Sequence, residues 1–123
     1  MKLLLYVGTG GFLGSVARYA ISRWMNQQIL SSIPWGTMTV NIAGCFIIGL
    51  IYALAFKSDL APEWRLLIAT GFCGGFTTFS SFSYENIALL QDGQFGAALF
   101  YIGGSLLLGL AATVAGIALI RAL

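Results

Sequence analysis

The 123-residue chain has no histidine and few charged residues, and each absence excludes a class of protein. Charged residues make up 8% of the chain, whereas a typical soluble domain has about 25%. So little charge does not keep a globular protein in solution, and lipid is the expected solvent. Without histidine the chain lacks the commonest metal ligand and general base, so we do not expect an enzyme. The net charge of +2 predicts no nucleic-acid partner.

Cysteine is also scarce. Cys45 and Cys73 each lie inside an apolar run, and we interpret both as buried packing residues. A disulfide between them stays open as the alternative, although nothing in the sequence indicates an oxidising compartment.

Hydrophobic residues make up 59% of the chain and fall into long runs. About 20 apolar residues in a helix cross a bilayer core of about 30 Å. The sequence therefore predicts an all-α integral membrane protein, with one domain over 1–123. The expected four transmembrane helices lie at roughly 3–24, 36–56, 65–90 and 95–120. All three tryptophans stand at predicted ends of these helices, where indole rings favour the interface.

The first run resembles a secretory signal peptide, because Lys2 and an apolar stretch precede small residues before Arg18. We expect a transmembrane helix there instead, since the apolar pattern continues past Arg18.

Positive charge is distributed weakly between the two expected sides of the membrane. One side holds Lys2, Lys57, Arg65 and Arg121, and the other holds Arg18 and Arg23. So weak a bias under the positive-inside rule permits insertion in both orientations, and hence an antiparallel dimer.

The 16 glycines lie mostly inside the predicted helices. Small residues such as Gly10-xxx-Gly14 and Gly71-xxx-Gly75 let helices approach closely in lipid. Four helices of this length enclose little volume, so a transport function would require a homo-oligomer.

The third predicted helix is irregular. Its run 71–85 is rich in Gly, Ser and Thr, and Gly74-Gly75 before two threonines disfavours a continuous helix. We predict a break between Gly75 and Ser80. Backbone carbonyls freed by a break can bind a cation, and the new helix N-terminus can face an anion. The alternative is a kinked helix whose hydroxyls bond to their own backbone.

Other residues stand out at membrane depth. Phe79 and Phe82 share a helical face, where they are either core residues or present positive ring edges to an anion. Asn41 either joins two helices or donates to an anion in a pore. Arg18 either snorkels to the interface or attracts anions into a vestibule. Glu85 either pairs with Arg18 or faces water.

The fourth predicted helix carries a stripe at i, i+4 spacing, formed by Tyr101, Ser105, Gly109 and Thr113. Hydroxyls on such a face suit a strongly hydrated anion, and hydrogen bonds between helices are the alternative interpretation.

Three motifs together resemble the Fluc family of small bacterial fluoride channels, also called CrcB proteins. They are Gly11-xx-Gly14-xxx-Arg18-Tyr19, Gly36-Thr37-xxx-Asn41-xx-Gly44 and the run 71–82, and they cover the chain in the family's order. The resemblance implies a dual-topology antiparallel homodimer in the bacterial inner membrane. Its two pores would export fluoride passively, and a structural Na⁺ would lie on the dimer axis.

The resemblance also implies roles for single residues. The fluoride pore would be lined by Asn41, Phe79, Phe82, Ser80, Ser81, Tyr101 and Ser105. Main-chain carbonyls of Gly74 and Thr77 would bind the Na⁺, and Arg18 would sit at the vestibule. Glu85 and Thr113 are further candidates from their placement alone.

Two other classes compete with the channel. Proton-coupled small multidrug transporters also have four short helices, but they use an acid in the first, where this chain has Arg18 and no acid. A scaffold protein that transports nothing would need Asn41 for stability only.

Overall fold

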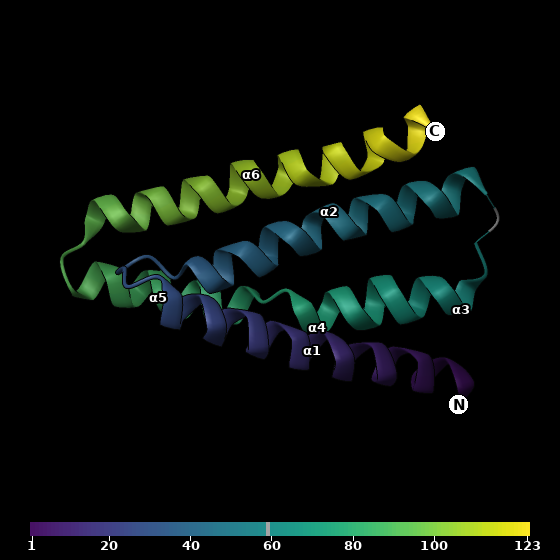
Figure 1. Ribbon diagram of the computed structural model, residues 1–123, viewed down its shortest axis with the longest axis horizontal. Helices are drawn as coiled ribbons and strands as arrows, with labels where there is room; N and C mark the ends of the chain where they lie inside the picture. Colours follow the sequence, from purple (N-terminus) through teal and green to yellow (C-terminus); the bar gives the residue numbers. More distant parts are fainter. Residues whose placement is uncertain (59) are drawn as a thin grey trace.

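The computed structural model describes residues 1–58 and 60–123, and this part of the chain is helical without any strand. Helix α1 (Lys2–Gln28) is followed by α2 (Trp35–Lys57), by an interrupted third rod and by α6 (Phe95–Ala122). The rods lie lengthwise beside one another, and both termini are at the same end of the bundle (Figure 1). Lys2 and Arg121, which are expected on one side of the membrane, therefore belong to helix ends at the same end of the bundle.

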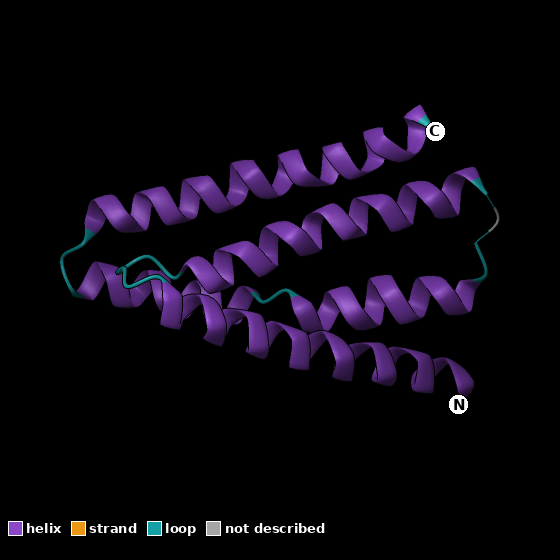
Figure 2. Cartoon of the chain, viewed as in Figure 1, coloured by secondary structure: helices purple, strands orange, loops and turns teal. Residues whose placement is uncertain are grey.

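The third rod consists of several pieces. It starts as α3 (Pro62–Arg65), continues as the π-helical segment η1 (Leu66–Cys73) and α4 (Gly74–Phe76), and resumes as α5 (Phe79–Gln91). Between α4 and α5, Thr77 and Thr78 are extended, with ψ angles of 157° and 121°. Figure 2 shows this interruption as a loop within the rod. The predicted break between Gly75 and Ser80 is therefore confirmed, whereas the π-helical turns before it were not predicted.

Within the described residues, three stretches are long and apolar enough to cross a membrane. They are Trp35–Lys57, Pro62–Gln91 and Phe95–Ala122. Helix α1 has 27 residues, but it is less apolar than α2 and α6. By length and composition, the chain is an all-helical membrane protein.

Glycines bring α1 directly against the third rod. A Cβ atom at Gly10 or Gly14 would overlap backbone oxygens of η1. Conversely, a Cβ atom at Gly71 or Gly75 would come within 2.8 or 2.5 Å of backbone oxygens of α1. The close approach expected of the two small-residue motifs is thus present, and the two motifs face each other.

Helix α6 packs along α2 (Figure 1). A cluster of buried side chains, Met38, Leu89, Ala98 and Tyr101, joins α2, α5 and α6 toward the end away from the termini. Both cysteines are free thiols; Cys73 is buried, as expected, whereas Cys45 is half-buried.

Candidate functional site

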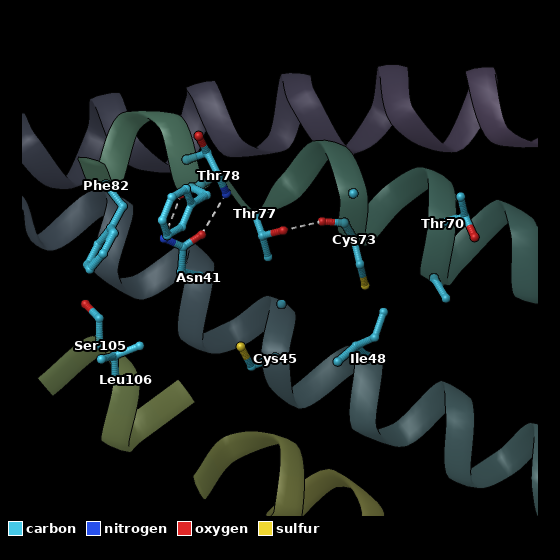
Figure 3. Close-up of a pocket in the computed structure, with 14 residues that line it drawn as sticks. Asn41, Cys45, Ile48, Thr70, Cys73, Thr77, Thr78, Phe82, Ser105 and Leu106 are labelled. Carbon is cyan, nitrogen blue, oxygen red and sulfur yellow. Dashed lines mark hydrogen bonds between the residues drawn. The ribbon is translucent and has the colours of Figure 1, made fainter. Parts of the chain in front are cut away.

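Asn41 on α2 makes two hydrogen bonds with the backbone at the break. Its Oδ1 accepts from the Thr78 N–H at 2.7 Å, and its Nδ2 donates to the Thr78 carbonyl at 3.1 Å (Figure 3). The Asn41 side chain therefore provides the hydrogen-bond partners that the Thr78 N–H and carbonyl would have had in a continuous helix. Of the two interpretations of Asn41, the structure shows the one that joins helices. An amide nitrogen carries two hydrogens, so one donor remains beyond this pairing.

Arg18 on α1 is tied to the same break. Its Nε donates to the Gly75 carbonyl at 2.8 Å. That carbonyl lies in the last turn of α4, where helical acceptors have no intrahelical donor. A cation at a helix C-terminus also interacts favourably with the helix dipole. Arg18 therefore caps α4 and does not extend away from the bundle.

The carbonyls of Gly74 and Thr77 both lose their ordinary helical donors. A continuous helix would pair Gly74 with the Thr78 N–H, which donates to Asn41 instead. It would likewise pair Thr77 with the Ser81 N–H, which donates to the Thr78 hydroxyl at 3.2 Å. Gly74 is exposed in the single chain, and no atom lies within 4 Å of where its Cβ would be. Two carbonyls deprived of donors beside open space fit a hard cation, which prefers oxygen ligands.

A cavity of about 560 Å³ lies against the break, between α2, the third rod and α6 (Figure 3). Asn41, Thr77, Phe79, Phe82 and Ser105 are among its lining residues. The structure thus brings together, on one cavity, most of the residues that the sequence analysis selected for a pore.

Three aromatic rings form a continuous row beside this cavity. The Phe79 and Phe82 centroids are 5.9 Å apart, and Phe82 meets Tyr101 edge to face at 5.0 Å. Phe79 is 80% exposed in the single chain, whereas Tyr101 is fully buried. The two phenylalanines are therefore not an ordinary core pair, because only one side of the row is covered.

Ser105 on α6 has a buried hydroxyl oxygen with no hydrogen-bond partner. Figure 3 shows it on the side of α6 that faces Phe82. A buried hydroxyl without a partner is costly in a protein interior. An unpaired donor that lines a cavity at membrane depth therefore suits a ligand that accepts hydrogen bonds.

Glu85 accepts two hydroxyl donors. Thr37 donates to its Oε2 and Tyr101 to its Oε1, each at 3.0 Å. In the described part of the chain it forms no ion pair with Arg18, so the suggested pairing between them is wrong. The Tyr101 hydroxyl is also occupied here and does not point a free donor into the larger cavity.

Arg18 and Glu85 nevertheless share a second cavity, of about 450 Å³. Arg23, Thr78 and Ser81 also line it, and Thr78 lines both cavities, so the second cavity also borders the break. Ser80 is exposed, with its hydroxyl 3.3 Å from that of Thr78. Positive side chains and hydroxyls thus dominate this cavity beside a single carboxylate.

Gly109 and Thr113, the remaining members of the α6 stripe, lie away from the break. The Thr113 hydroxyl donates to the Cys45 and Gly109 carbonyls, each at 3.2 Å. Neither residue lines either cavity. For this half of the stripe, the structure shows hydrogen bonding between helices.

Sequence reasoning did not single out Thr37 and Thr78. Thr78 is the N-cap of α5, and its hydroxyl accepts from Ser81. A Thr directly before the apolar Phe79 at the start of a predicted helix is an N-cap signal that could have identified it. Thr37 had no such signal, because its partner Glu85 is 48 residues away.

These features define a class: a helical membrane protein with a discontinuous helix whose broken backbone borders a cavity. Membrane channels and transporters place ion sites at such breaks. A family model described as "CrcB-like protein, Camphor Resistance (CrcB)" matches residues 5–117, and the chain belongs to this family.

Curated relatives agree over nearly the full length. The fluoride-specific ion channel FluC of Rhizobium johnstonii is 48% identical over 97% of this chain and 96% of its own. FluC of Chlorobium chlorochromatii is 50% identical over 93% and 88%, and FluC of Acidobacterium capsulatum is 46% identical over 91% and 90%. These relatives are named as ion channels and not as enzymes, in agreement with the expectation for this chain.

Proposed function

We propose that this protein is a fluoride channel of the bacterial inner membrane, which lets toxic fluoride leave the cell passively. The names of the relatives support the ion. The observation that carries the proposal is the unpartnered Ser105 hydroxyl on the same cavity as the exposed Phe79 ring and the Asn41 amide. Of the two buried polar side-chain atoms without a hydrogen-bond partner in the described residues, the Ser105 hydroxyl is the one whose residue lines this cavity, and a scaffold gives no reason for that placement.

Fluoride is small and strongly hydrated, so a pore must replace its water with several donors and still release it. The free N–H of Asn41 and the Ser105 hydroxyl supply donors in the larger cavity, and ring edges of Phe79 and Phe82 supply weaker positive contacts. Ser80 and Ser81 add hydroxyls beside Thr78. Tyr101 contributes by holding Phe82 and Glu85 rather than by donating to fluoride.

The second cavity would be the vestibule. Arg18 and Arg23 line it, and positive walls raise the local concentration of anions. Because Arg18 is held by the Gly75 carbonyl, its charge stays at the break. Glu85 has both oxygens engaged by neutral hydroxyls, so its carboxylate is used to position Thr37 and Tyr101.

We also propose that α1 is the fourth transmembrane helix. Its 27 residues exceed the length needed to cross a bilayer. Its glycines place it directly against the third rod, which is itself apolar enough to cross. The inward-facing Arg18 has a backbone partner and therefore does not prevent insertion.

The functional unit would be an antiparallel homodimer with two pores. Gly74, Phe79 and Ser80 are exposed in the single chain next to irregular backbone. Irregular backbone at membrane depth is tolerated only when protein or water covers it, so a second copy is the expected cover. The weak charge bias of the sequence suits copies inserted in opposite orientations.

A central Na⁺ completes the proposal. The Gly74 and Thr77 carbonyls of both copies would hold it on the dimer axis, since both lack helical donors. Once bound, the ion supplies positive potential next to the anion path. The chain's own part is to keep these carbonyls free, which Asn41 and Thr78 do by taking the competing N–H groups.

A growth experiment tests the proposal in cells. A bacterial strain that lacks its own fluoride exporter should grow in fluoride medium when it expresses this chain. The chain with Phe82→Ile, expressed at the same level, should not restore growth. Equal growth of cells with and without the chain, despite its presence in the membrane, would contradict the proposal.

A further inference from the structure

Another cavity lies far from the break, at the end of the bundle that bears both termini. It has a volume of about 450 Å³ and lies between the last turns of α2 and α6. Ala53, Ile117 and Ile120 give it apolar walls, and Lys57 and Arg121 also line it. Both helices are apolar enough to cross a membrane, so their ends fall where hydrocarbon meets lipid headgroups.

Lys57 lines this groove and is fixed to the opposite helix. Its Nζ donates to the Ile120 carbonyl in the last turn of α6, at 3.0 Å. An ammonium group has three N–H donors, so two remain for an acceptor outside the protein. Arg121, on the same turn of α6, adds a planar guanidinium whose fork matches phosphate oxygens. None of the described residues that line the groove is acidic.

The surroundings of the groove separate it from an ordinary helix cap. A lysine that only capped α6 would need neither a second cation nor an apolar cavity. Tyr52 and Phe56 also line the groove and are 52% and 97% exposed, as aromatic residues often are at a membrane interface. The cationic vestibule differs, because Glu85 lies inside it.

We propose that this groove binds an anionic phospholipid. Its phosphate would lie between Lys57 and Arg121, and one acyl chain would follow Ile117 and Ala53. Basic pockets between transmembrane helices are suited to such headgroups. A zwitterionic lipid brings its own cation next to Lys57 and Arg121, and therefore binds more weakly.

Native mass spectrometry of the purified full chain tests this, with phosphatidylglycerol and phosphatidylcholine of identical acyl chains as probes. The groove variant is Lys57→Gln with Arg121→Gln. Its matched control is Lys2→Gln with Arg65→Gln, which removes the same charge from the same end without touching the groove. Wild type should retain phosphatidylglycerol in preference to phosphatidylcholine. The groove variant should lose about thirtyfold in affinity for phosphatidylglycerol, and the control should lose little.

Three results would overturn the proposal. Equal losses in both double variants would mean that only diffuse surface charge attracts the lipid. Equal retention of the two lipids by wild type would mean that Lys57 and Arg121 do not favour an anionic headgroup over a zwitterionic one. A changed oligomeric state in the groove variant, with lipid retention intact, would mean that a second copy covers the groove.

Lys57→Gln also removes the hydrogen bond to the Ile120 carbonyl at the end of α6, so the double variant could misfold. Two further variants test the proposal without that change. Arg121→Gln breaks no hydrogen bond among residues 1–58 and 60–123, and Arg65→Gln is its control. Ala53→Leu adds volume to the groove without changing charge. Both Arg121→Gln and Ala53→Leu should lower retention of phosphatidylglycerol, and unchanged retention in both would contradict the proposal.

Discussion

The side chain of Asn41 pairs with both backbone groups of Thr78, accepting from its N–H at 2.7 Å and donating to its carbonyl at 3.1 Å. This pairing lets the third rod stay broken at membrane depth, because Thr78 needs no helical partners. It also withholds the Thr78 N–H from the Gly74 carbonyl. One side chain thus stabilises the break and leaves the Gly74 carbonyl, the proposed cation ligand, without its helical donor.

Replacing Asn41 should therefore destabilise the protein and also lower the fluoride flux. Asn41→Ala leaves the Thr78 N–H and carbonyl unpaired, which should cost about 1–3 kcal/mol. Thermal unfolding in detergent would measure the loss. Thr9→Ala on α1 is the control, since Thr9 is exposed and lines neither of the two cavities at the break. Unfolding at the same temperature as Thr9→Ala would show that the pairing is not structural.

Ser105 and Thr113 lie two turns apart on α6 and should respond in opposite ways. Ser105→Ala removes an unpartnered hydroxyl, so stability should hold while fluoride flux falls. Thr113→Ala removes hydrogen bonds to two carbonyls, so stability should drop by about 1 kcal/mol while flux per folded dimer changes little. Unfolding and fluoride-electrode traces on the same preparations separate the two effects. Unchanged flux in Ser105→Ala would remove Ser105 from the pore.

The aromatic row makes a separate prediction about conduction. Phe79→Ile or Phe82→Ile keeps an apolar side chain but removes the positive ring edge. If that edge contributes about 1.4 kcal/mol to passage, flux falls about tenfold. Phe12→Ile, which changes an exposed ring on α1, is the control. Size-exclusion chromatography should show the same dimer for all three variants, and wild-type flux in either pore variant would exclude that ring from the path.

Gly74→Ala tests the proposed dimer axis. Nothing within the single chain lies close enough to hinder the added methyl group. A loss of dimer would therefore come from the second copy or from the shared cation. Cross-linking should show more monomer for Gly74→Ala than for Gly96→Ala, where the methyl group is equally unhindered on α6. Dimers of equal stability would place Gly74 away from the axis.

The break itself could be predicted from sequence because its cause is local. Two glycines shortly before two β-branched residues lower the local helix propensity, and the interruption falls at Thr77 and Thr78. The close packing of α1 against the third rod could also be predicted from the small-residue motifs, because a Cβ atom at these glycines would overlap the backbone of the facing helix.

The partners of the polar residues could not be predicted, because they depend on how the helices are placed lengthwise against one another. Asn41 could be recognised as unusual, but its pairing with Thr78 depends on which turn of α2 lies beside the break. The sequence leaves Glu85 either paired with Arg18 or facing water, whereas in the structure it accepts hydroxyls from α2 and α6, and Arg18 donates to the Gly75 carbonyl. The regular spacing of Tyr101 to Thr113 gave no sign that its two halves meet different neighbours.

Fluoride efflux from liposomes tests the central claim most directly. Purified protein is reconstituted, and release of fluoride is followed with a fluoride electrode beside vesicles loaded with chloride. We predict fast fluoride release, negligible chloride release, and no release from vesicles without protein. Vesicles that hold demonstrably dimeric protein and still retain their fluoride would contradict the claim that the broken helix borders a fluoride path.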